Sequence, residues 1–216
     1  MSKKTDYDHW INLINSRGIA GVAARKANEK CIVERWVVNE FAETVRSTLF
    51  KDVSDIRSLD QHLNDFSMRI DGNLINIEVT ELINGNILAE FADAKKIEGS
   101  PSHPLYREHI RFGPSKQWFE DKMKKLISKK EKTYSKKIAK GDIDRLDILL
   151  IFNEDLNVTL DDIGIWLIDF KLPDTDSIDA IYFQNWYHPN YLARPAWSIK
   201  RHPLLGDMRP VLLPEK

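Results

Sequence analysis

The segment LNDFSMRIDGNLINIEVTEL, residues 63–82, carries the clearest structural pattern in the chain. Apolar and polar residues alternate on both sides of Asp71-Gly72, which is the period of a β-strand with one buried face. Asp-Gly is well suited to a two-residue turn with positive φ. We therefore predict a β-hairpin. Its expected buried residues are Phe66, Met68, Ile70, Ile75, Ile77 and Val79.

The predicted turn determines which residues lie opposite each other. If Asp71 and Gly72 form the turn, opposed residues have numbers that sum to 143, so Asp65 faces Glu78. Like charges at opposed positions destabilise a sheet. A divalent cation relieves this repulsion, because Mg²⁺ prefers oxygen ligands and is often held by one or two carboxylates, water and phosphate oxygens. The alternative is a solvated face on which both acids are ordinary polar residues.

The rest of the chain predicts an α/β fold built around this hairpin. Apolar residues at three- and four-residue steps indicate helices, and the apolar run DILLIF is typical of a strand covered on both faces. The expected helices span residues 6–16, 32–50 and 115–140, the last ending at Gly141. The expected further strands span 147–152, 163–170 and 180–186. We expect a surface excursion over 83–117 and a proline-rich coil over 187–216.

Lys130 stands out in the helix predicted at 115–140. It lies three residues after Ile127 and four before Tyr134, on the apolar stripe of that helix. One explanation is that its stem covers the core while the ammonium reaches water. The other is that the ammonium reaches Asp65 and Glu78, where it could stabilise a phosphate transition state. The sequence leaves both explanations open.

The same helix is strongly basic. Residues 122–140 contain nine lysines and one acid, Glu131, in a chain whose formal net charge is -1. This asymmetry is typical of contacts to a phosphate backbone, although a solvated helix face would also account for it. The candidate nucleic-acid-binding residues are Lys124, Lys125, Lys129, Lys132, Lys136 and Lys137.

Length and composition exclude several classes of protein. A chain of 216 residues is expected to form one domain, and its near-neutral charge excludes a uniformly basic, histone-like protein. A single cysteine excludes a disulfide scaffold, and no Cys/His zinc pattern is present. Without an apolar run of membrane-spanning length or a signal peptide, we expect a soluble, cytoplasmic protein with no membrane partner. We interpret Asp161-Asp162 as a strand-entry turn, and His188 and His202 as surface loop residues.

Residues 33–152 resemble the PD-(D/E)XK nuclease superfamily, whose restriction-endonuclease-like core is αβββαβ around a central mixed sheet flanked by helices. That family has an Asp near the start of one strand and Glu-x-Lys on the next; Asn64-Asp65 and Glu78-Val79-Thr80 match these motifs here. The resemblance implies that Asp65, Glu78 and the Val79 carbonyl hold Mg²⁺ or Mn²⁺. The family's helical glutamate is best matched by Glu40, with Glu34 and Glu43 further from the apolar stripe.

Two departures separate this chain from the family pattern. Asn64 replaces a proline that carries no chemistry, and Thr80 replaces the motif lysine. Family members with threonine there often carry the lysine on the following helix, in a pattern similar to that around Lys130. The resemblance thus implies a nuclease that cleaves phosphodiester bonds, in DNA, by metal-activated water, with Thr80 and Lys130 in its catalytic site. The alternative is a catalytically inactive nuclease-fold protein that binds nucleic acid or a protein partner, such as an inhibitor or immunity factor. A homodimer or a regulatory protein partner stays open.

Overall fold

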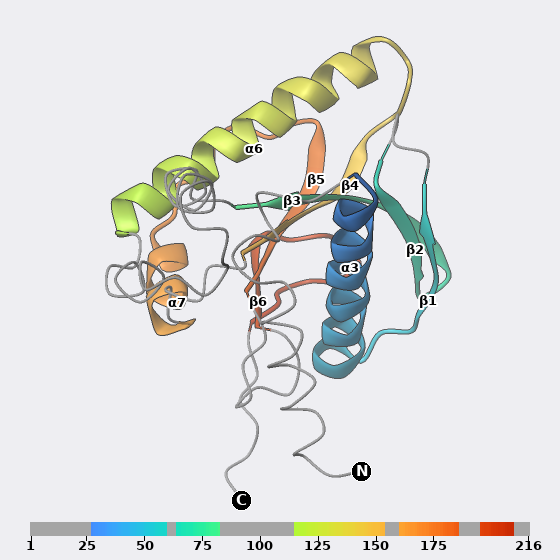
Figure 1. The fold of residues 1–216 in the computed structure, drawn as a ribbon, viewed down its shortest axis with the longest axis horizontal. Helices are drawn as coiled ribbons and strands as arrows, with labels where there is room; N and C mark the ends of the chain where they lie inside the picture. The colour runs from blue at the N-terminus through green and yellow to red at the C-terminus, as the bar shows by residue number, and fades with distance from the viewer. Residues whose placement is uncertain (1–26, 60–63, 83–114, 154–159, 186–194, 210–216) are drawn as a thin grey trace, which may run out of the picture. The chain divides into compact units, whose positions relative to one another are not determined.

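A computed structural model describes residues 27–59, 64–82, 115–153, 160–185 and 195–209 (Figure 1). The chain divides into two compact units, Met1–Ile32 with Ile83–Phe112 and Val33–Leu82 with Gly113–Lys216. The first unit lies almost wholly outside the described residues, so the account below concerns the second, and the expectation of one domain stays a prediction. The predicted helix at 6–16, residues 83–114 of the surface excursion, and His188 also lie outside the described residues.

The described part of the chain is an α/β structure with a six-stranded mixed sheet and helices on both faces, which confirms the predicted class (Figure 1). The strands follow one another across the sheet in chain order. They are β1 (Val53–Ser58), β2 (Phe66–Ile70), β3 (Asn73–Glu81), β4 (Leu146–Phe152), β5 (Ile178–Gln184) and β6 (Ala196–Lys200). The helices are α3 (Ala27–Leu49), α6 (Lys116–Ala139) and α7 (Leu160–Ile168). Among these helices, none combines the length with the apolar composition that a membrane span needs.

Strand directions follow from the connections. β1, β2 and β3 pair antiparallel, while β3, β4 and β5 pair parallel. The connection from β3 to β4 contains α6, and the connection from β4 to β5 contains α7, because parallel neighbours require a crossover. β6 returns antiparallel along β5.

The hairpin has the predicted register. Ile70 pairs with Asn73 at the turn, and Phe66 pairs with Ile77 at the other end of the ladder. The two turn residues, Asp71 and Gly72, have φ values of 49° and 81°, as a turn of this kind requires. The turn therefore sets the alignment of every residue in β2 and β3.

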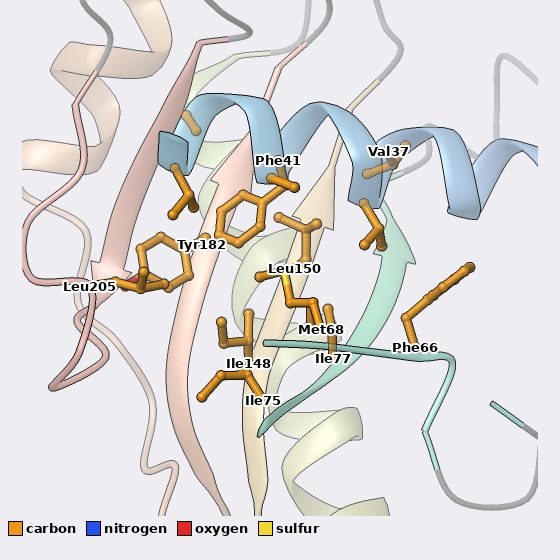
Figure 2. Packing of buried hydrophobic residues seen from close by; sticks show 14 of the residues in the cluster. Val37, Phe41, Phe66, Met68, Ile75, Ile77, Ile148, Leu150, Tyr182 and Leu205 are labelled. Atoms are coloured by element: carbon orange, nitrogen blue, oxygen red, sulfur yellow. The ribbon is translucent and has the colours of Figure 1, made fainter. Parts of the chain in front are cut away.

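Two hydrophobic cores lie on opposite faces of the sheet. α3 covers one face, where its apolar stripe packs on residues of β2 to β5 (Figure 2). This core includes Val37, Phe41, Met68, Ile77, Leu150 and Tyr182. α6 and α7 cover the other face, with Phe119, Met123, Ile127, Leu149, Ile151 and Phe183. Because both faces of β4 are covered, its sequence is apolar along nearly the whole strand, as predicted.

The predicted strand at 163–170 is wrong, because this segment lies in and just after helix α7. Ile163 and Leu167 are one helical turn apart and belong to the core on the α6 side, while Ile165 and Ile168 are 59% and 79% exposed. Asp161-Asp162 is accordingly the first turn of a helix and not a strand-entry turn. Carboxylates are favoured there by the helix dipole.

The C-terminal segment is also more regular than predicted. The expected coil contains β6, which pairs with β5 between the positions of Pro195 and Pro203. His202 is 6% exposed and is not a surface residue, which corrects the interpretation from sequence. Its backbone N–H donates to the Tyr182 hydroxyl at 3.1 Å, and its Nδ1 accepts from Leu204 N–H at 3.2 Å.

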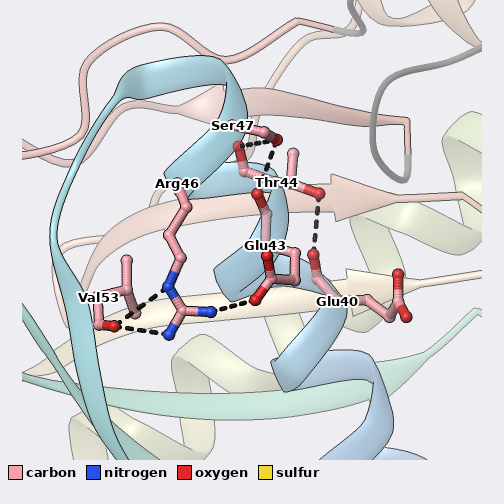
Figure 3. A network of polar contacts seen from close by, with 6 residues as sticks. All are labelled: Glu40, Glu43, Thr44, Arg46, Ser47 and Val53. Atoms are coloured by element: carbon pink, nitrogen blue, oxygen red, sulfur yellow. Dashed lines mark hydrogen bonds and ion pairs between the residues drawn. The ribbon is translucent and has the colours of Figure 1, made fainter.

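A polar network holds the end of α3 to the start of β1 (Figure 3). The Arg46 guanidinium donates to the Val53 carbonyl through Nε at 3.2 Å and Nη2 at 2.6 Å, and it also pairs with Glu43. Two residues before Arg46, the Thr44 hydroxyl donates to the Glu40 carbonyl at 2.9 Å. These contacts fix where the helix ends relative to the sheet.

Candidate active site

Glu78 lies in the middle of β3 and faces α6, on the side of the strand opposite Ile77 and Val79. Its side chain is 14% exposed. The Lys130 ammonium pairs with its Oε1, and the Tyr134 hydroxyl donates to its Oε2 at 2.6 Å. Lys130 and Tyr134 are four residues apart on α6, so both project from one helical face. Both oxygens of this carboxylate are therefore held by one turn of α6.

Asp65 immediately precedes β2, one step beyond the last pair of the hairpin ladder. Its Oδ2 accepts the Val79 backbone N–H at 2.9 Å. Burial and the nearby Glu78 carboxylate raise the pKa of Asp65 from 3.8 to about 6, although the Val79 N–H and the Lys130 ammonium act in the opposite direction. The hairpin thus brings the Glu78 carboxylate close enough to Asp65 to raise the pKa of Asp65.

A third carboxylate, Glu34 on α3, also raises the pKa of Asp65. Glu34 is 8% exposed. It lies three residues before Val37 and four before Val38, on the buried stripe of α3, and this spacing could have identified it from the sequence. Glu40, the glutamate chosen from the sequence, is half-buried, and its carbonyl belongs to the Thr44 contact near the other end of the helix. Glu34 is therefore near enough for its charge to act on Asp65, and metal binding by Glu40 stays a prediction.

Tyr134 is the site residue that sequence analysis treated only as part of an apolar stripe. It is fully buried, yet its hydroxyl meets a carboxylate. Burial and the Glu78 charge raise the pKa of the Tyr134 hydroxyl far above its ordinary value of 10.0. Tyr134 is consequently a neutral hydrogen-bond donor across the physiological range, and it orients Glu78.

Val79 and Thr80 complete the motif on β3. The Val79 side chain is 2% exposed and belongs to the core beneath α3, while its N–H binds Asp65. Thr80 follows Glu78 by two residues and therefore lies on the same face of the strand. The ammonium beside Glu78 comes from Lys130 and not from position 80. A metal contact by the Val79 carbonyl and a catalytic role for Thr80 stay predictions.

The six candidate nucleic-acid-binding lysines do not form one group. Lys124 pairs with Glu120 at 3.6 Å, and the Lys137 ammonium lies 4.6 Å from the centre of the Tyr134 ring. The other four are exposed on α6, namely Lys125, Lys129, Lys132 and Lys136.

Asp65 and Glu78 are the candidate ligands for a divalent cation. Among the described residues, no group of three or more His, Cys, Asp or Glu side chains is arranged to hold a metal ion. Two carboxylates are nevertheless sufficient for Mg²⁺ when water and phosphate oxygens complete its coordination. Within the described part of the chain, Asp65 Oδ1 accepts no hydrogen bond, and each Glu78 oxygen retains a second lone pair. The donor chemistry of Asp65 and Glu78 is therefore compatible with a two-carboxylate site, and metal binding by this pair stays a prediction.

Comparisons with known proteins leave the site to be interpreted from its own geometry. A scan against protein-family models and searches of curated proteins and solved structures found no match to this chain.

Proposed function

We propose that this protein is a metal-dependent nuclease that hydrolyses phosphodiester bonds, in DNA, with a PD-(D/E)XK-type site on a restriction-endonuclease-like core. The observation that carries the proposal is the Lys130 ammonium paired with Glu78 while Glu78 raises the pKa of Asp65. The order α3, β1 to β3, α6, β4 supports it, because it is the αβββαβ order of that core. Thr80 stands where the family has its motif lysine, which is the main objection to a nuclease. Lys130 answers this objection, because it supplies an ammonium beside the two carboxylates.

Asp65 and Glu78 are the residues that would hold Mg²⁺ or Mn²⁺. The chemistry supplied by the bound cation is a water of lowered pKa and neutralisation of phosphate charge. The Val79 N–H and the Tyr134 hydroxyl hold the two carboxylates in position. Lys130 places a positive charge where negative charge develops on the phosphate, and a charge oriented before the reaction stabilises the transition state most effectively.

The test of this function is cleavage of plasmid and single-stranded DNA by the purified protein. We expect products with millimolar Mg²⁺ or Mn²⁺ and none when a chelator is in excess. Readdition of metal should restore cleavage, which separates metal dependence from damage by the chelator. Cleavage that persists in the chelator, or a complete absence of cleavage with either metal on both substrates, would contradict the proposal.

One observation favours the second candidate, an inactive nuclease-fold binding protein. Both oxygens of Glu78 already have partners within the protein, so a cation is not needed to satisfy that carboxylate. In this case DNA or a protein partner would bind with the same affinity in metal and in chelator, and no products would form.

Replacing Lys130 by Met should lower the cleavage rate about a hundredfold, because a charge oriented at the reacting phosphate is lost. Met keeps an apolar stem of similar length, and Tyr134 still donates to Glu78, so the protein should remain folded. The measurement is the single-turnover rate at saturating DNA together with the midpoint of urea unfolding.

Lys116→Met is the matched control. Lys116 lies in the first turn of the same helix and contacts Asp169 at 3.4 Å, and this substitution should leave the rate within about twofold of wild type. Equal rates for wild type, Lys130→Met and Lys116→Met would show that Lys130 serves packing alone.

A further inference from the structure

The exposed side of α6 carries a straight row of lysines. Its members are Lys125, Lys129, Lys132 and Lys136 of the helix and Lys140, the residue at its C-cap, and we call them the outer lysine stripe. All five are exposed and follow one another at steps of three or four residues. At 100° and 1.5 Å per residue, they lie within about 80° of one another and span about 22 Å of helix. The stripe is therefore one continuous positive surface.

The outer lysine stripe is not neutralised by the acids of its own helix. Glu120 pairs with Lys124, and Asp121 accepts from the Gln117 amide at 2.9 Å. Glu131 accepts the Ser177 backbone N–H at 3.0 Å. Among the described residues, no carboxylate forms an ion pair with a lysine of the stripe.

The stripe and the candidate active site lie on different sides of the helix. Lys130 and Tyr134, which contact Glu78, point about 140° away from the centre of the stripe by the helical period. An α-helix with its side chains is about 10–12 Å wide. One phosphate cannot contact both surfaces, so the phosphates that bind the stripe are different from a phosphate at the Asp65 and Glu78 carboxylates.

We propose that the outer lysine stripe binds the phosphate backbone of a nucleic acid, at a place separate from the cleavage site. Along the axis of a DNA duplex, its length corresponds to about six base-pair steps at 3.4 Å each. Lysine is depleted in protein–protein interfaces, and the stripe lacks the aromatic and arginine anchors typical of them. Exposed Ser128 and Thr133 flank it, and such hydroxyls commonly contact phosphates. The choice of polymer rests on the proposed function, but the binding itself does not require cleavage.

The test measures binding of a fluorescent DNA duplex in excess chelator, where cleavage does not contribute. We compare wild type with a triple variant, Lys125→Gln, Lys129→Gln and Lys132→Gln. Each lost contact should reduce the slope of log K against log salt by about 0.9, so the triple variant should lose about 2.7 and bind at least about tenfold more weakly at low salt. Thermal unfolding of the variant should match wild type, because these side chains are exposed.

The control removes three lysines elsewhere, Lys51→Gln, Lys116→Gln and Lys171→Gln, and should keep the wild-type slope. An equal loss in both triple variants, or no loss in either, would overturn the proposal. Competition by poly-glutamate as strong as competition by unlabelled DNA would also overturn it, in favour of an acidic protein partner. A protein that binds through the stripe but never cleaves would contradict only the nuclease proposal.

Discussion

Replacing Glu78 by Gln should abolish detectable DNA cleavage, with a loss of at least about a thousandfold in rate, while the protein remains folded. Gln has nearly the same shape, and its amide oxygen can still accept from Lys130. The Tyr134 hydroxyl can reverse its role and accept from the Gln amide, because a phenol both donates and accepts. What disappears is the negative charge of the Glu78 carboxylate, which lies near Asp65. The measurement is the single-turnover rate with Mg²⁺ and with Mn²⁺.

Glu81→Gln is the control for this substitution. Glu81 lies three residues further along β3, so strand alternation directs it to the opposite face of the sheet. The Glu81 variant should cleave at nearly the wild-type rate. If Glu78→Gln retained more than about a tenth of the wild-type rate, Glu78 would have no direct part in the reaction.

The hairpin and half of the site were predictable because local chemistry determines them. The Asp71-Gly72 turn needs two residues at positive φ, and this requirement fixed the register that aligns Asp65 with Glu78. Lys130 was conspicuous because a charged residue interrupted an apolar helical stripe. The pairing of its ammonium with Glu78 depends on how α6 packs across β3, and only the structure shows it.

Glu34 and Tyr134 show why the remainder of the site was missed. From the sequence, Glu34 was placed further from the apolar stripe than Glu40, although its spacing from Val37 and Val38 puts it on that stripe. Tyr134 was assigned to the core for its ring, and it is indeed fully buried. A hydroxyl inside a core needs a partner, and the identity of that partner, Glu78, depends on an element 56 residues away.

The errors in the fold have a different cause. α7 is short, and its apolar residues alternate in part like those of a strand, so only its contacts on the α6 side of the sheet distinguish the two. β6 lies among prolines, which normally argue against a strand. In the described part of the chain, however, it is an edge strand and has β5 as its single neighbour. β1 is the other edge of the sheet and was not predicted, because its buried and exposed residues do not alternate cleanly.

The charge of Asp65 should make the site a source of instability at neutral pH. In the unfolded chain its pKa is near the ordinary 3.8, whereas in the folded protein burial and Glu78 raise its pKa to about 6. A raised pKa means that folding opposes the ionisation of Asp65. The contribution of protonated Asp65 to the free energy of unfolding is therefore fully present below about pH 4, and it is lost as pH rises through about 6. The shift corresponds to at most about 3 kcal/mol, and to about 1–2 kcal/mol once partial exposure to solvent is allowed for.

Replacing Asp65 by Asn should therefore stabilise the protein and abolish cleavage at the same time. Asn is neutral at every pH, and its oxygen can still accept the Val79 N–H. The free energy of unfolding of the Asp65→Asn variant should exceed that of wild type by about 1–2 kcal/mol at pH 7.5, and this gain should vanish near pH 4. Urea unfolding at the two pH values measures this difference.

The change in Tm on adding metal is a second measurement on wild type and the Asp65→Asn variant. If Asp65 helps to bind Mn²⁺ or Mg²⁺, metal at ten times its dissociation constant should stabilise wild type by about 1.4 kcal/mol, or roughly 3–5 °C in Tm for a chain of this size. The Asp65→Asn substitution removes a ligand, so the Tm of that variant should not respond. If Asp65→Asn instead lowered stability equally at both pH values and left the metal response intact, the carboxylate would have a structural role alone. A stability that rises while cleavage disappears is the result expected of a charged group kept for catalysis at the expense of folding.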